Sequence, residues 1–147
     1  MTYQIRDSFI LNGENYLLVH IQPKGHRWFS PYHYGFNPYY NCTACWSGYQ
    51  CSYTIKDNIL YLTTLNINNK GDNYPIFEGV VANTTNPYWH FNASYNDIFL
   101  DFKFTGKVLI AKDVNVNIKM LKKWNIKMYS FLTYLLPLEL PKRLVFL

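Results

Sequence analysis

The chain has 147 residues, the size of one domain that can bury a hydrophobic core without metals or disulfides. Aromatic residues make up 19% of the chain, and 14 residues are tyrosines, which favours the pleated, half-buried surfaces of β-sheets. The net charge is +5: residues 1–100 carry −1 (five Lys/Arg against six Asp/Glu) and residues 101–147 carry +6 (nine against three). A basic end can bind nucleic acid or an anionic membrane, but such charge runs are more often a solvated face.

We expect neither a targeting segment nor a membrane span. The N-terminus has no basic stretch followed by an apolar one, and no window reaches about 18 uninterrupted apolar residues. Three cysteines are an odd number, whereas disulfide frameworks of small secreted proteins normally use an even one. These features predict a cytoplasmic protein with reduced thiols.

The first expected element is a β-hairpin. Residues 8–11 and 14–21 are apolar runs joined by Asn12-Gly13, a pair that tolerates the positive φ angles of a two-residue turn. The aromatic segment, residues 22–41, follows. Its prolines and glycines exclude a helix and a central strand, and its many aromatic side chains predict that it folds over a sheet face or lines a groove.

A second hairpin is expected in the middle of the chain. Residues 48–56 alternate with period two, which places Tyr49, Cys51 and Tyr53 on one face of a half-buried strand. Asp57-Asn58 turns the chain, and residues 59–67 form the returning strand.

Shorter strands and a helix are expected in the rest of the chain. The strands fall at residues 76–81, 89–91, 98–104, 107–111 and 113–118. Beyond them, apolar residues recur at spacings of three and four, which predicts a helix that ends before Pro137; its apolar positions are Leu121, Trp124, Met128, Phe131, Leu132 and Leu135. We therefore divide the chain into a β-rich domain, residues 1–118, and an amphipathic helix with an apolar tail, residues 119–147, docked on it.

These elements predict a mainly β fold, with an antiparallel sheet or a partly open barrel of hairpins and a C-terminal helix. Trp46 is expected to anchor the core. The full set of predicted core residues is Tyr16, Leu18, Trp46, Tyr49, Tyr53, Ile55, Tyr61, Leu65, Phe102 and Leu109.

The most distinctive motif is Cys42-x-x-Cys45 followed by Cys51, with His26 and His33 upstream. These residue types can ligate zinc, and a C-x-x-C can be a redox pair. A structural zinc site usually has a second knuckle, and a redox pair needs a helix N-terminus that this β-rich context does not offer. We therefore expect buried or incidental thiols and no metal or cofactor, with Cys51 packed on a strand face.

No catalytic motif stands out, so we assign no catalytic residue. His20, His26, His33 and His90 show no metal-binding spacing, and no serine lies in a Gly-x-Ser-x-Gly elbow. Asp97, Asp101 and Glu78 are the carboxylates beside strands, and ion pairing or turn formation is their usual role. A Cys–His pair assembled only in three dimensions stays open.

The aromatic segment carries the binding hypothesis. Exposed tyrosine and tryptophan side chains can stack on bases or sugars, or can anchor a protein partner. Nucleic acid is not expected, since residues 22–62 hold only Lys24, Arg27 and Lys56 among these aromatics. The candidate binding residues are Trp28, Tyr32, His33, Tyr34 and Tyr39.

The stretch Thr43-Ala44-Cys45-Trp46-Ser47-Gly48-Tyr49, with Leu60-Tyr61-Leu62 after it, resembles a group of small uncharacterised bacterial proteins whose pattern is Thr-Ala-x-Trp-Arg-Gly-Tyr. The resemblance covers roughly residues 3–115 and implies an independent β-rich domain. It implies no activity. Ser47 stands where the pattern has arginine, and the chain beyond Met120 differs from the group's usual ending.

Two functions remain open. The first is a non-enzymatic protein-interaction module, such as a partner-binding or immunity-type protein, because an aromatic segment occurs without an assembled catalytic motif. The alternative is a small ligand-binding or hydrolytic domain with a pocket under the aromatic segment, using His33 or His90. The oligomeric state is not predicted.

Overall fold

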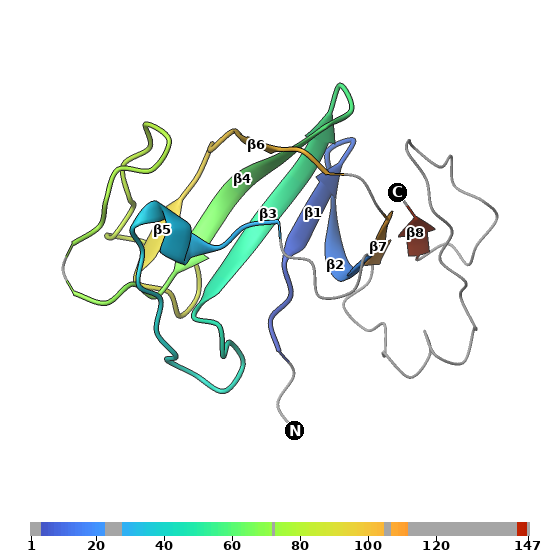
Figure 1. The fold of residues 1–147 in the computed structure, drawn as a ribbon. Helices are drawn as coiled ribbons and strands as arrows, with labels where there is room; N and C mark the ends of the chain where they lie inside the picture. Colours follow the sequence, from blue (N-terminus) through green and yellow to red (C-terminus); the bar gives the residue numbers. More distant parts are fainter. Residues whose placement is uncertain (1–3, 23–27, 72, 105–106, 112–143, 147) are drawn as a thin grey trace.

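The computed structural model describes residues 4–22, 28–71, 73–104, 107–111 and 144–146, and they form a mainly β fold (Figure 1). Within these residues, one turn of 3-10 helix and eight strands follow one another: β1 (Ser8–Leu11), β2 (Glu14–Gln22), η1 (Pro31–Tyr34), β3 (Tyr49–Lys56), β4 (Ile59–Ile67), β5 (Ala93–Tyr95), β6 (Leu100–Phe102), β7 (Lys107–Ala111) and β8 (Leu144–Phe146). The predicted helix over residues 121–135 and the predicted strand over 113–118 lie outside the described residues. Within them, no helix has the length and apolar character needed to cross a membrane.

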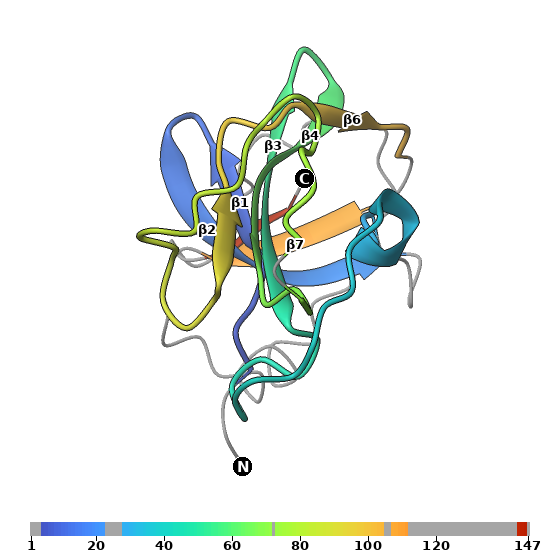
Figure 2. The ribbon, with the colours of Figure 1, turned by 90° about the vertical axis from the view of Figure 1, so that its left-hand side faces the viewer.

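The strands form a single open sheet in the order β5-β4-β3-β1-β2-β7-β8. β6 lies off this order and pairs with residues 60–62 of β4, whereas β5 pairs with residues 65–67 of the same strand. Its two end strands, β5 and β8, lie on opposite sides of the molecule in Figure 1. The sheet is strongly twisted, so that β7 runs at a steep angle to β3 and β4 (Figure 2). The expected sheet is antiparallel, and the six other pairings among the described strands are antiparallel, but the sheet is mixed, because β1 pairs with β3 in parallel.

Local turn chemistry explains the two hairpins at the centre of the sheet. Asn12 and Gly13 have φ angles of 50° and 78°, and Asp57 and Asn58 have φ angles of 52° and 61°. Two consecutive positive φ angles define the turn whose twist matches that of paired strands. The predicted hairpins β1–β2 and β3–β4 are therefore confirmed.

Two of the predicted short strands are wrong. Residues 76–81 form a tight turn, in which Phe77 and Val80 exchange both backbone hydrogen bonds, at 3.0 and 2.9 Å, around Glu78 and Gly79 with positive φ. Residues 89–91 form a turn as well, because Trp89 has a φ of 51°. The strand in this region is β5, which begins at Ala93, two residues after the end of the predicted strand.

The core covers one face of the sheet. Phe9, Leu62, Leu65, Tyr95 and Ile110 are among its fully buried side chains. Of the predicted core residues, Leu18, Tyr53 and Leu65 are buried, and four more are partly buried against the core: Tyr16, Tyr49, Ile55 and Phe102. Leu109 lies in β7, but its side chain is outside the described part.

The described part of the aromatic segment, residues 28–41, folds over this same face, which is one of the two placements predicted for it. Trp28, Phe29 and Phe36 are buried within the core. The Trp28 ring meets Tyr53 edge-on at 4.9 Å between centroids, and Phe36 meets Tyr95 edge-on at 5.4 Å. Such pairs add stabilisation of about 0.5–1.5 kcal/mol beyond the buried area. Figure 2 shows η1 on one side of β3 and β4 and the loop before β5 on the other.

Two predicted core residues, Trp46 and Tyr61, lie outside the core. Trp46 is 67% exposed. It lies in a turn closed by a 3.3 Å bond from Gly48 N–H to the Cys45 carbonyl, so the alternation of β3 begins only at Tyr49. Tyr61 is half-buried on the outer face, because an irregularity in the β3–β4 register puts Leu62 and Leu65 on the same side.

Candidate functional site

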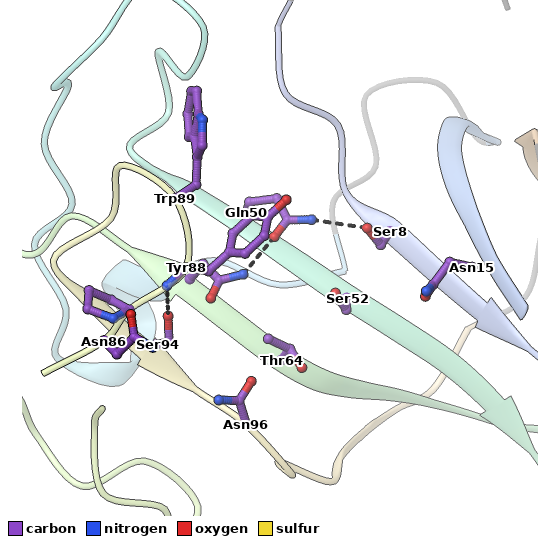
Figure 3. Close-up of a pocket in the computed structure, with 12 residues that line it drawn as sticks. Ser8, Asn15, Gln50, Ser52, Thr64, Asn86, Tyr88, Trp89, Ser94 and Asn96 are labelled. Carbon is purple, nitrogen blue, oxygen red and sulfur yellow. Dashed lines mark hydrogen bonds between the residues drawn. The ribbon is translucent and has the colours of Figure 1, made fainter. Parts of the chain in front are cut away.

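The polar side chains of the sheet gather on the face opposite the core. They alternate with core residues along the strands, so that Ser8 precedes Phe9 and Ser52 lies between Cys51 and Tyr53. Together with the loop before β5 they line a cleft of about 660 Å³ (Figure 3). We call it the polar cleft; its lining residues are Ser8, Asn15, Gln50, Ser52, Thr64, Asn66, Asn86, Pro87, Tyr88, Trp89, Ser94 and Asn96.

Hydroxyl and amide groups dominate this lining. Apart from Pro87, Tyr88 and Trp89, every lining residue is a serine, threonine, asparagine or glutamine, and none is an Asp, Glu, Lys, Arg or His. Each hydroxyl and each amide side chain can both donate and accept hydrogen bonds. Among the described residues, the lining of the polar cleft is therefore rich in hydrogen-bonding groups and holds no charged side chain.

A buried amide pair forms part of the cleft wall. Asn66 Nδ2 donates to Gln50 Oε1 at 2.9 Å. Gln50 Nε2 donates to Ser8 Oγ at 3.2 Å and to the Arg6 carbonyl at 3.3 Å. These bonds tie β4, β3 and β1 together across the outer face and hold the Gln50 amide in one orientation.

One polar atom of this pair is unsatisfied. Asn66 is only 5% exposed, and its Oδ1 is buried with no hydrogen-bond partner among the described residues. A buried acceptor without a partner costs about 1–3 kcal/mol, and folded proteins contain few of them. Asn66 Oδ1 is therefore a buried acceptor in the cleft wall whose hydrogen-bonding capacity is unused within the described residues.

The loop before β5 is held in place by its own hydrogen bonds. Asn83 Oδ1 accepts from the backbone N–H groups of Thr85 and Asn86, each at 3.2 Å. Asn83 also exchanges backbone bonds of 2.8 and 3.0 Å with Ser94, and Ser94 Oγ accepts from Tyr88 N–H at 2.9 Å. The aromatic end of the loop is thus anchored directly to β5.

Tyr88 and Trp89 form the aromatic rim of the polar cleft. Tyr88 is 57% exposed and its ring extends toward Gln50, whereas the Trp89 side chain points away from the strands (Figure 3). Trp89 has a φ of 51°, which is uncommon for a bulky residue and costs about 1–3 kcal/mol. Backbone strain of this kind concentrates at functional sites.

The predicted binding residues of the aromatic segment do not line the polar cleft. Trp28 is buried in the core, Tyr34 stacks on Phe29 at 5.3 Å, and Tyr39 is half-buried. Tyr32 and His33 are exposed on η1. Their role in binding stays a prediction, and it concerns a different surface from the cleft.

Two of the three cysteines are buried, and Cys42 is half-buried. Cys51 is fully buried in β3, as predicted, and Cys45 is buried in the turn before it. Burial raises the pKa of the Cys45 thiol above its usual value of 9.0. Within the described ranges, no three His, Cys, Asp or Glu side chains come together as metal ligands.

The candidate acid and base residues lie outside the cleft lining. His33, His90, Glu78, Asp97 and Asp101 are all exposed. The backbone carbonyl of His90 accepts a 3.1 Å hydrogen bond from Asn41 Nδ2. The His90 ring packs edge-on against the Trp89 ring, with 4.2 Å between the ring centroids. These contacts give His90 a place beside the rim of the cleft.

The polar cleft has no distinctive signature in the sequence. Its only trace was the polar half of the alternation, such as Ser52 in β3 and Thr64 and Asn66 in β4, which looks the same on any solvated sheet face. The loop residues Asn86 to Trp89 carry no motif, and a strand was expected where Trp89 turns.

Comparison of the chain with known protein families, with curated protein sequences and with solved structures finds no match. The function therefore has to be argued from the geometry of the site.

Proposed function

We propose that this protein is a non-enzymatic binding domain and that the polar cleft is its binding site. The observation that carries the proposal is the composition of the cleft together with the unsatisfied Asn66 Oδ1 in its wall. A volume of about 660 Å³ falls within the range of about 300–1,000 Å³ that small-molecule sites occupy. The anchored loop and the Gln50–Asn66 pair preform part of the site, which reduces the entropy lost on binding.

The lining argues for binding rather than catalysis. General acid–base catalysis needs a group whose pKa lies near the working pH, usually a histidine or a carboxyl group. Tyr88 is the one residue with an ionisable side chain among those that line the cleft, and it is a phenol. Hydrogen bonding and ring contact are the interactions that these side chains support.

The proposal is tested by mapping small molecules onto the surface of the full chain. A library of neutral and charged fragments is screened by two-dimensional NMR, and the shifted amide signals are assigned. We expect the hits to shift signals around Ser52, Thr64 and Ser94. The variant Thr64→Trp, which fills the cleft, should abolish these shifts, whereas Thr43→Trp, at an exposed position outside the cleft, should leave them unchanged. Hits that map elsewhere, or that survive Thr64→Trp, contradict the proposal.

A protein partner bound at the aromatic segment is the second candidate. It is favoured by three strongly exposed aromatic side chains in or beside that segment, namely Tyr32, Tyr40 and Trp46. Exposed tyrosine and tryptophan residues are enriched in the energetically dominant parts of interfaces. Cross-linking in the native host followed by mass spectrometry tests this candidate: cross-linked peptides should surround these residues, and Tyr32→Ser should reduce their yield. Cross-links confined to other surfaces would remove it.

A further inference from the structure

The polar cleft differs in composition from most small-molecule sites. Those sites are lined mainly by apolar and aromatic side chains, with a few polar groups that fix orientation. Here the proportions are reversed, since nine of the twelve lining residues carry a hydroxyl or amide side chain without an aromatic ring. A ligand that matches this lining exposes mostly hydrogen-bonding groups.

We infer that the ligand is a neutral sugar ring, recognised by the hydroxyl and amide groups of the polar cleft and packed against Tyr88. This inference rests on the proposed binding function. Sugar hydroxyls both donate and accept, as do the side chains of the lining. The apolar C–H face of a pyranose ring can cover an aromatic side chain that offers an apolar body and a polar tip.

Several lining groups have hydrogen-bonding capacity to spare. The side-chain hydroxyls of Ser52 and Thr64 have no hydrogen-bond partner within the described part of the chain, and both residues are half-buried. Asn15 and Asn96 are exposed on either side of them. Together with the buried Asn66 Oδ1, these groups offer hydrogen-bond donors and acceptors on β2, β3 and β4 and just after β5.

The unsatisfied Asn66 Oδ1 specifies a donor. The amide nitrogen of Asn66 already donates to Gln50 Oε1 at 2.9 Å. The unpartnered group is the amide oxygen, and an amide oxygen can only accept a hydrogen bond. This oxygen is closed to solvent, so a sugar hydroxyl reaches it only when the wall of the cleft rearranges.

The absence of charge from the lining separates a sugar from other ligands. Phosphorylated and nucleic acid ligands need lysine or arginine groups to offset their charge, and none lines the part of the cleft that the structure describes. A sugar acid would leave its carboxylate unpaired. A free nucleoside has a ring that stacks, but it brings fewer hydroxyl groups to the nine polar side chains.

The test measures binding of defined sugars to the full chain by saturation-transfer NMR and calorimetry. The probes are maltose, cellobiose, lactose, chitobiose and mannobiose, with glucuronate and uridine as the charged and nucleoside comparisons. We expect at least one neutral disaccharide to bind with a Kd of about 1 mM or tighter. We expect glucuronate and uridine to bind at least about tenfold more weakly. The sugar ring can come from a polysaccharide or from a free sugar, and a longer oligomer of the same sugar distinguishes these two sources. Tighter binding of the oligomer points to a polysaccharide, and equal binding points to a free sugar.

Variants locate the sugar in the cleft. Tyr88→Ala should weaken binding about tenfold or more, whereas Tyr40→Ala, a similarly exposed tyrosine outside the cleft, should leave it unchanged. Thr64→Val removes a hydroxyl at nearly constant shape and should weaken binding about fivefold to tenfold without changing the melting temperature. Because Tyr88 is at the surface, Tyr88→Ala should still fold.

Two results would overturn the inference. One is that no neutral sugar binds at about 10 mM, or that uridine or glucuronate binds more tightly than every sugar. The other is that Tyr88→Ala and Thr64→Val bind like the parent. If fragments still map to the cleft while sugars fail, the binding function stands and only the sugar class is wrong.

Discussion

The two faces of the central strands use the same backbone for opposite purposes. On the inner face, Phe9, Tyr53 and Leu65 belong to the core cluster that also contains aromatic side chains of the aromatic segment. On the outer face, Ser8, Ser52 and Thr64 are left beside a cleft. Successive residues of one strand thus divide between stability and a surface that can bind, which predicts different consequences for substitutions one residue apart.

The largest effect is expected on the inner face. Phe9→Ala removes a fully buried ring from β1 and should lower the free energy of unfolding by about 3–5 kcal/mol. Chemical denaturation measures it. The control is Phe99→Ala, at a phenylalanine that is 64% exposed, where the change should stay within about 0.5 kcal/mol. Equal losses for the two variants would contradict the assignment of the faces.

Alkaline pH should weaken the inner face. Burial raises the pKa of Tyr95 to about 12 and holds that of Tyr53 well above 10.0. The folded state then keeps protons that the unfolded chain loses above pH 10, so this contribution is complete below pH 10 and is lost as the pH rises toward 12. Tyr95→Phe should flatten the decline, although it also removes the 2.7 Å bond to the Pro75 carbonyl. Denaturation curves from pH 8 to 12 that show no decline would refute the burial of both phenols.

On the outer face, the Gln50–Asn66 pair should contribute a smaller amount. Gln50→Leu leaves the buried Asn66 Nδ2 without its acceptor and should cost about 1–3 kcal/mol. Replacing both residues by leucine should cost less than the sum of the two single changes, because no unpaired amide remains. A double-mutant cycle in urea measures the difference, and strict additivity would show that the two amides do not interact.

The smallest effect is expected at Trp46. Because its side chain is 67% exposed, Trp46→Ala should change the free energy of unfolding by no more than about 0.5 kcal/mol. Sequence reasoning placed this ring in the core, where its loss would cost about 3–5 kcal/mol. The melting temperature of the variant distinguishes these two positions directly.

The features that sequence reasoning found are those set by neighbours in the chain. Asn12-Gly13 and Asp57-Asn58 predicted two hairpins, because positive φ at adjacent residues is a local property. The alternation of β3 placed Cys51 and Tyr53 correctly in the core for the same reason.

The features that sequence reasoning missed depend on distant parts of the chain or on an irregularity that changes the in–out alternation along a strand. A period of two gives the face of a residue but not the neighbouring strand, so the parallel β1–β3 pairing had no visible signal. A single irregularity in β4 moved Tyr61 to the outer face. The polar cleft needed residues from strands and a loop that only the folded sheet brings together.

The parallel pairing of β1 with β3 also governs the order of folding events. Each hairpin can form from residues within its own stretch, but Ser8 and Ser52, which lie 44 positions apart in the sequence, meet only after the chain between them has closed into a loop. Contacts so distant in sequence slow folding, so joining the two hairpins is expected to limit its rate. Ser8 and Ser52 both line the polar cleft, and the cleft therefore forms only after β1 has paired with β3.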